Sequence, residues 1–303
     1  TVEVVAYGVQ KKVTVTGALS SIKGEDLTRT PVSSVNNVLA GQLSGVTTVQ
    51  YSGEPGSDAA KVFVRGKATF NGADPLIQVD GVERSMGDID PEEIENITIL
   101  KDASATAVFG VRGANGVILI TTKRGKEGKA TVTANTSFSI LAPTKMVEQA
   151  DSYGYATFYN QLRKNDGKDP QFSDAIIEKF RTGSDPIRFP SIKWDDYIMK
   201  KSTTQTKTNV SISGGTKKMR YFINGGMYTQ GGLFKEFGQD YKFGYQYSRF
   251  NYRANLDLDV TSTTTLSFNI AGNVDNSNKP NTGQGASGMV FLMKVVGIKC
   301  IMH

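Results

Sequence analysis

The chain has 303 residues, a net charge of +6, one cysteine and one histidine, which is the last residue, His303. A single cysteine excludes an intramolecular disulfide and a cysteine-built zinc site, and a terminal histidine argues against a Ser-His-Asp triad or a histidine metal cluster. The basic residues are scattered among polar residues rather than clustered with stacking aromatics, so we expect no nucleic-acid partner, no cofactor, no metal and no enzymatic activity.

The first residues predict a short strand. Val2, Glu3, Val4 and Val5 combine three β-branched side chains with one acid, a composition that favours extended structure. An exposed strand of this kind can recruit a partner strand through main-chain hydrogen bonds. The alternative is an ordinary first strand of the domain that follows, and the residues alone leave both interpretations open.

The next part of the chain predicts a compact α+β domain that extends to about residue 125. A serine at position 33 or 34 caps a helix that continues to Leu43 and ends at Gly45. The acidic run from Asp88 to Glu95 starts another short helix, and we expect its carboxylates to be solvated rather than to form a metal site. Strands are predicted at Val46–Val49, Lys61–Arg65 and Leu76–Val79.

Residues 95–126 contain a strand, a short helix, a glycine-rich turn and a second strand. Asp102 is placed to cap a helix of small residues, and Gly110 is placed to end it. The segment from Gly113 to Gly116 offers the backbone freedom of a tight turn. The run from Val117 to Thr122 is apolar and β-branched, which predicts a buried strand.

From residue 126 to about 288, apolar and polar residues alternate in segments of about ten residues, which predicts antiparallel strands. A soluble sandwich gives similar alternation, but aromatic residues near the strand ends favour the first strands of an incomplete transmembrane β-barrel. A long loop, residues 141–205, is expected on the extracellular side. In it, Trp194 and Tyr197 are candidates for stacking on a ligand ring, with packing that anchors the loop as the alternative. Residues 289–303 lack the alternation, and we interpret them as an atypical tail that marks a truncation.

Several motifs resemble one family, the SusC/RagA family of TonB-linked outer-membrane proteins. The segment 100–126 resembles the signature of the family's plug domain, and residues 2–8 resemble the segment before the plug. Residues 41–46, 64–66 and 79–82 resemble further plug motifs in the same order. The resemblance implies an α+β plug domain in residues 1–125, followed by antiparallel β-strands of an incomplete transmembrane β-barrel in residues 126–288.

The resemblance also implies roles for particular residues. Residues 2–5, within a segment 1–8 that resembles a TonB box, would contact TonB, which acts with ExbB and ExbD. Arg65 and Arg112 would hold the plug against carboxylates on the barrel wall. The remaining plug-motif glycines and turn residues are Gly66, Asp80, Gly81, Asp102, Gly110, Gly113, Asn115 and Gly116.

The function implied is import through the outer membrane. The chain would be the N-terminal part of an importer embedded in outer-membrane lipid, and its plug would gate the barrel lumen. A SusD-like lipoprotein would deliver oligosaccharides or peptides. The alternative is a soluble or cell-surface β-sandwich that binds a ligand without transporting it.

Overall fold

The computed structural model describes residues 2–5, 8–11, 19–64, 66, 74–144, 149–238, 244–261 and 263–279. Arg65 and the tail 289–303 therefore lie outside the described residues. The chain forms two compact units, of which the first contains residues 1–139, 204–230 and 246–277, and the second contains residues 140–203, 231–245 and 278–303. The N-terminal α+β domain and most of the long strands thus belong to one unit.

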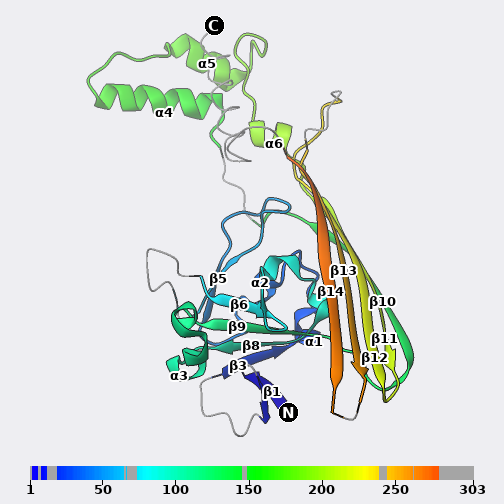
Figure 1. The fold of residues 1–303 in the computed structure, drawn as a ribbon. Helices are drawn as coiled ribbons and strands as arrows, with labels where there is room; N and C mark the ends of the chain where they lie inside the picture. Colours follow the sequence, from blue (N-terminus) through cyan, green and yellow to red (C-terminus); the bar gives the residue numbers. More distant parts are fainter. Residues whose placement is uncertain are drawn as a thin grey trace. The chain divides into compact units, whose positions relative to one another are not determined.

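A five-stranded mixed sheet is the centre of the N-terminal domain (Figure 1). The strands β6 and β9 are parallel, and the other neighbours in the sheet are antiparallel. The predicted strands at 76–79 and 117–122 are confirmed with the same bounds. In spatial order the strands are β3 (Leu19–Lys23), β8 (Ile94–Leu100), β9 (Val117–Thr122), β6 (Leu76–Val79) and β7 (Val82–Glu83).

Short helices and two small two-stranded sheets complete this domain. Ser34 caps α2 by accepting a hydrogen bond from the backbone of Asn36, but α2 is a single turn and ends well before the predicted Leu43. The two-stranded sheets are β1 (Val2–Val5) with β2 (Gly8–Lys11), and β4 (Val46–Val49) with β5 (Lys61–Val64). The helices are α1 (Gly24–Leu27), α2 (Val35–Val38), η2 (Met86–Asp88), η3 (Pro91–Glu93), α3 (Ala103–Thr106) and η4 (Ala107–Gly113).

An apolar core lies on one face of the mixed sheet. Ile97, Ile99 and Ile118 are fully buried in it, together with Leu27 and Val35 from the helices. Burial of one such side chain stabilises a fold by roughly 1.5–3 kcal/mol. This core holds the N-terminal domain together without a disulfide.

Two glycines show why the segment 110–116 is glycine-rich. Gly110 has φ 57° inside η4 and interrupts the helical backbone there. Gly116 has φ 90°, and a Cβ at this position would lie 2.7 Å from Cγ1 of Val64. The turn therefore needs glycine both for its backbone conformation and for the close approach of β5.

The second sheet of the first unit is made of five long strands in sequence order, β10-β11-β12-β13-β14 (Figure 1). In the β11–β12 pair, Ile212 lies opposite Ile223 and Val210 lies opposite Gly225. The predicted strands are confirmed and are longer than ten residues. Their bounds are β10 (Gly128–Leu141), β11 (Thr203–Gly215), β12 (Met219–Gly231), β13 (Gln246–Asp259) and β14 (Thr265–Asn278).

The two faces of this long-strand sheet differ in chemistry. One face is apolar and exposed, and it carries Val210, Ile212, Ile223, Met227, Phe250, Tyr252, Leu266, Phe268 and Ile270. The other face is polar and buried, and it carries Gln205, Lys207, Asn209, Asn224, Arg249, Asn251, Arg253 and Asn255. Because side chains alternate between faces along a strand, this division follows directly from the period of two in the sequence.

The second unit contains α4 (Ser152–Asn165), α5 (Asp174–Thr182) and α6 (Trp194–Ile198). Ala156, Phe172 and Phe180 form its buried cluster between α4 and α5. No helix in the described part of the chain has the length and apolar composition needed to cross a membrane.

Candidate functional site

The polar face of the long-strand sheet contacts the acidic segment of the N-terminal domain. Arg253 on β13 donates from Nε to Oε2 of Glu93 at 2.7 Å, and its Nη1 lies 3.8 Å from Oδ2 of Asp80. The side chains of Arg253 and Glu93 are 3% and 2% exposed. Asn224 on β12 also donates to Glu93, at 3.5 Å. A buried guanidinium and a buried carboxylate thus join the two sheets.

A second buried ion pair joins the same acidic segment to a different strand. Lys207 on β11 places Nζ 3.0 Å from Oδ1 of Asp90, with both side chains at least nine-tenths buried. The same Asp90 oxygen accepts a hydrogen bond from the backbone of Glu92, so this carboxylate also caps η3. Pro91 begins η3 directly after that cap, which fixes the backbone between Asp90 and Glu93. The 3-10 turn therefore presents Asp90 and Glu93 to two different strands.

Arg249 on β13 contacts backbone carbonyls instead of a carboxylate. Its Nη1 donates to the carbonyl of Gly87 at 2.8 Å, and its Nη2 donates to the carbonyl of Ser33. Asn251, two residues further along β13, donates to the carbonyl of Asp88 at 3.1 Å. Successive inward positions of β13 thus bind successive parts of the N-terminal domain.

Asp80 and Thr122 complete the contact at the end of β9. Asp80 has φ 49° and accepts hydrogen bonds from the backbone N–H of Thr122 at 3.0 Å and from its hydroxyl at 2.6 Å. Asn255 on β13 donates to the same hydroxyl and to the carbonyl of Lys123. We use the name polar seam for Asp80, Asp90, Glu93, Lys207, Arg249 and Arg253.

Burial controls the electrostatics of the polar seam. The pKa of Glu93 is raised above 4.5, first because burial penalises the charged carboxylate and further because Asp90 lies nearby. The charge of Arg253 and its hydrogen bond to Glu93 lower this pKa, because both stabilise the charged carboxylate, but they do not outweigh burial. Outside the fully buried contacts, Arg124 pairs with Asp257 of β13 at 2.9 Å.

One sequence prediction is wrong at this site. The acidic run Asp88–Glu95 is predicted to be solvated, but Asp90 and Glu93 are each 2% exposed. Their cations lie 117 or more residues away in the sequence, so the local pattern does not reveal them. The signal available in the sequence is the polar residue at every second position of β13, from Arg249 to Asn255.

The family resemblance implies that Arg65 and Arg112 contact carboxylates of a barrel wall. In the structure, the guanidinium of Arg112 pairs with Glu83 of β7, within the N-terminal domain, and both side chains are more than half exposed. Arg65 lies outside the described residues. The role of these two arginines stays a prediction, and the structure places four other charged residues, Asp90, Glu93, Lys207 and Arg253, in buried ion pairs between the two sheets.

The plug-motif residues mostly serve the backbone. Positive φ angles occur at Gly66, Gly81, Gly110 and Gly116. At Gly113, a Cβ would lie 2.9 Å from the carbonyl oxygen of Thr106, so close packing excludes a side chain there. Asp102 occupies the N-cap position of α3, and Asn115 donates to the carbonyl of Asp74 at 3.5 Å.

The remaining predicted site residues belong to elements that are not part of the polar seam. Val2–Val5 form β1 and pair with β2. In the second unit, Trp194 packs against Ile198, Phe234 and Tyr245. Tyr197 is 55% exposed, and its ring stacks on Phe237. Within the described residues no cluster of His, Cys, Asp or Glu side chains fits a metal ion.

Comparison with known proteins establishes the family. The family model "TonB-dependent Receptor Plug Domain" matches residues 11–117. TonB-dependent receptor P3 of Formosa agariphila is 34% identical over 272 residues, which cover 89% of this chain and 24% of that protein. This chain belongs to the TonB-dependent receptor family. TonB-dependent receptor SusC of Bacteroides thetaiotaomicron is 32% identical over 246 residues, covering 77% of this chain and 23% of SusC.

Solved structures of TonB-dependent receptors share the fold. The structure of the RagAB peptide importer in the "open-open" state matches 92% of this chain and 32% of the chain compared, with 24% identity and a TM-score of 0.73. The siderophore receptor PirA from Acinetobacter baumannii matches 89% of this chain and 34% of that chain, with 15% identity and a TM-score of 0.54. The N-terminal domain is thus the plug, and the long-strand sheet, which we now call the wall, is the first part of a barrel that five strands do not close. The chain spans about a quarter of the length of the curated relatives that it matches.

Proposed function

We propose that this chain is the N-terminal part of an outer-membrane importer of the SusC type, in which the plug gates the lumen of the complete barrel. The observation that carries the proposal is the division of the wall into two faces. The inward face is bound to the plug through the polar seam, and the outward face exposes apolar side chains such as Ile270, which is 62% exposed. An apolar outward band with a polar lumen is the pattern of an outer-membrane barrel.

The alternative β-sandwich function is not favoured. In a sandwich, the apolar face of one sheet is covered by a second sheet, and the polar face is solvated. In the described part of the chain the arrangement is the reverse, because the polar face is covered by the plug and the apolar face is exposed. Contact with outer-membrane lipid accounts for this arrangement.

The gating step follows from the kind of contact that joins the plug to the wall. A pull on residues 2–5 by TonB, energised through ExbB and ExbD, would act on the short β1–β2 pair before it reaches the domain core. The polar seam consists of separate ion pairs and hydrogen bonds, which break one at a time and leave the apolar plug core intact. Release of the seam would open the lumen.

For the transported substrate, we propose oligosaccharides or peptides, delivered by a SusD-like lipoprotein. The support comes from the relatives' names, since SusC matches over 77% of this chain and RagAB is described as a peptide importer. Tyr197 and Phe237 offer a stacked aromatic surface in the second unit that suits either ligand. The relatives are named as receptors or importers, so we propose transport without enzymatic chemistry.

Deletion of residues 1–8 tests this proposal in the full-length receptor. We expect uptake of the substrate to be lost while ligand binding at the cell surface stays unchanged, because the deletion removes only the segment that is pulled. The matched control is a receptor in which residues 1–8 are replaced by the corresponding segment of SusC, and we expect it to retain uptake. Unchanged uptake after the deletion would contradict the proposal.

A further inference from the structure

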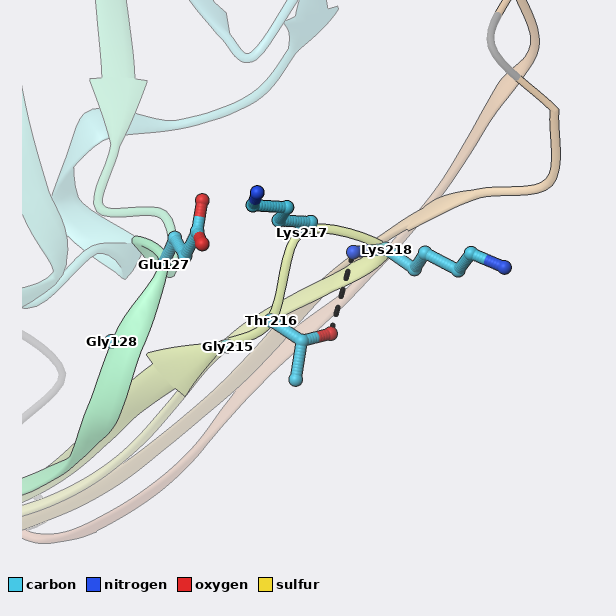
Figure 2. Close-up of a pocket in the computed structure, with 6 residues that line it drawn as sticks. All are labelled: Glu127, Gly128, Gly215, Thr216, Lys217 and Lys218. Atoms are coloured by element: carbon cyan, nitrogen blue, oxygen red, sulfur yellow. Dashed lines mark hydrogen bonds between the residues drawn. The ribbon is translucent and has the colours of Figure 1, made fainter.

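An open surface cavity of about 550 Å³ lies where the chain passes from the plug into β10, beside the turn between β11 and β12 (Figure 2). Two lysines and one glutamate are among its lining residues, and Lys217 and Glu127 supply the charged groups that face each other. The lining residues are Glu127, Gly128, Gly215, Thr216, Lys217 and Lys218.

The turn that carries the two lysines is fixed by its own hydrogen bonds. The backbone N–H of Thr216 donates to the carbonyl of Met219 at 2.7 Å. The hydroxyl of Thr216 accepts from the backbone N–H groups of Lys218 and Met219, at 3.3 and 3.2 Å. Figure 2 shows that Lys217 extends toward Glu127, whereas Lys218 extends in the opposite direction.

Glu127 lies on the other side of the cavity, and the packing of Gly125, two residues earlier, fixes its backbone there. Gly125 packs against the backbone of Tyr221 so closely that a Cβ would collide with it, and this contact fixes the segment that leads into β10. The nearby Arg220 is paired with Asp259 at 2.7 Å. Within the described residues, neither Glu127 nor the two lysines of the turn form an ion pair, and the charge of Glu127 contributes to raising the pKa of Arg220. The cavity thus presents one ammonium and one carboxylate that can each take a partner of opposite charge.

The position of the turn along the wall indicates the kind of ligand. Ile212 and Ile223 form an outward-facing pair, and Met219, the first residue of β12, is still 40% exposed. Gly215, the last residue of β11, follows Ile212 by three residues, so at roughly 3.3 Å per residue it lies about 10 Å beyond that pair, and Lys217 is in the turn that follows. Lysine side chains at the end of an apolar surface place their charges among lipid headgroups. Lys126 and Lys129, both exposed, add to the positive charge there.

We propose that this cavity binds the headgroup of a phospholipid that carries both a phosphate and a primary ammonium group. Lys217 donates to the phosphate oxygens, and the ammonium donates to the carboxylate of Glu127. Lys218 increases the attraction for phosphates from the other side of the turn. The proposal rests on the outer-membrane location proposed above, and it assigns a lipid site at the turn between β11 and β12 of the wall.

Native mass spectrometry of the full-length receptor tests this site. The purified receptor is equilibrated with equal amounts of phosphatidylethanolamine and phosphatidylcholine, which share a phosphate but differ in their ability to donate from the ammonium. We expect the wild type to retain phosphatidylethanolamine preferentially. The double substitution Lys217→Glu/Lys218→Glu is expected to lower retention of both lipids about tenfold or more. Glu127→Gln is expected to retain both lipids without preference.

The matched control is Lys200→Glu/Lys201→Glu, an adjacent pair of exposed lysines in the second unit, which should leave lipid retention unchanged. Equal retention by the wild type and the Lys217→Glu/Lys218→Glu variant would overturn the proposal. Displacement of the lipid by an equal concentration of inorganic phosphate would also overturn it, in favour of a free-anion site. If these failures occur while the receptor fractionates with the outer membrane and imports substrate, only the lipid site is rejected. Absence of the wild type from the outer membrane would reject both proposals.

Discussion

The core of the plug and the surface where the plug meets the wall are equally buried but chemically opposite. In the core, Ile97, Ile99 and Ile118 have no exposed surface and contact other apolar groups. In the polar seam, Arg253, Glu93 and Asp90 are 2–3% exposed and contact charges or backbone groups. The plug core is therefore held by apolar packing, whereas the polar seam is held by ion pairs and hydrogen bonds.

This contrast bears on the proposed gating, in which the plug would leave the wall and stay folded. Apolar burial contributes about 25 cal/mol for each Å² and favours collapse in any register. A buried ion pair contributes little net stability, because desolvation offsets attraction, but it strongly disfavours every arrangement that leaves one partner unpaired. The polar seam therefore fixes the position of the plug more than it stabilises the fold.

Breaking one ion pair of the polar seam should have the largest effect. Arg253→Met leaves Glu93 buried without its cation, which should destabilise the seated plug by about 3–5 kcal/mol. The measurement is thermal or denaturant unfolding of the full-length receptor, followed by protease access to the plug. The matched control is Arg181→Met, which breaks the exposed pair with Glu178 and should cost less than about 1 kcal/mol.

The double variant Arg253→Met/Glu93→Leu adds a second test of the same pair. Because both charges are then removed, part of the lost stability should return relative to Arg253→Met alone. If the loss of stability in the double variant equals the sum of the losses in Arg253→Met and Glu93→Leu, the two residues act independently.

A substitution in the plug core should destabilise the receptor somewhat less than Arg253→Met, but it should unfold the plug itself. Ile118→Ala removes three buried carbons and should cost about 2–4 kcal/mol. We expect the plug to lose structure as a domain, which limited proteolysis of the full-length receptor would detect as cleavage within β8 and β9. Cleavage confined to residues 88–93 would contradict the distinction between core and seam.

The acidity of Glu93 gives an effect that depends on pH. Burial raises the pKa of this carboxyl above 4.5. Because the folded-state pKa is the higher one, the contribution of Glu93 is most favourable below 4.5 and is lost as the pH rises through the folded-state pKa. The stability of the wild type relative to Glu93→Gln should therefore fall by up to about 1.4 kcal/mol per pH unit between 4.5 and that folded-state pKa, and then level off. Denaturant unfolding of both proteins across this pH range is the measurement. A difference that grows with rising pH would show that Arg253 outweighs burial.

Arg112→Ala should give the smallest effect. Its pair with Glu83 is exposed on both sides, so we expect a loss of stability below about 1 kcal/mol and little change in uptake. If Arg112 also binds a carboxylate of the complete barrel, uptake will change much more than the stability of the plug. Comparison of uptake rates for Arg112→Ala and Arg253→Met distinguishes the two cases.

Local chemistry makes much of the fold predictable. The apolar run Val117–Thr122 forms β9, and Gly110 and Gly116 have the positive φ angles expected of a stop and a turn. The alternation in the long strands can also be predicted from the sequence, because it depends only on the period of the strand.

The polar seam cannot be predicted from the sequence, because the burial of Glu93 depends on Arg253, which lies 160 residues later in the chain. The helix after Ser34 is shorter than predicted, since its apolar spacing is satisfied by turns that pack on the same core.

The separation between plug core and polar seam can be measured by amide hydrogen exchange in the full-length receptor, compared between the wild type and Arg253→Met. We expect faster exchange, by about tenfold or more, at residues 88–96 and 122–123, with unchanged exchange at Ile97–Ile99 and Ile118–Ile120. Equal acceleration throughout the plug, or no acceleration at residues 88–96, would show that seam and core do not act separately.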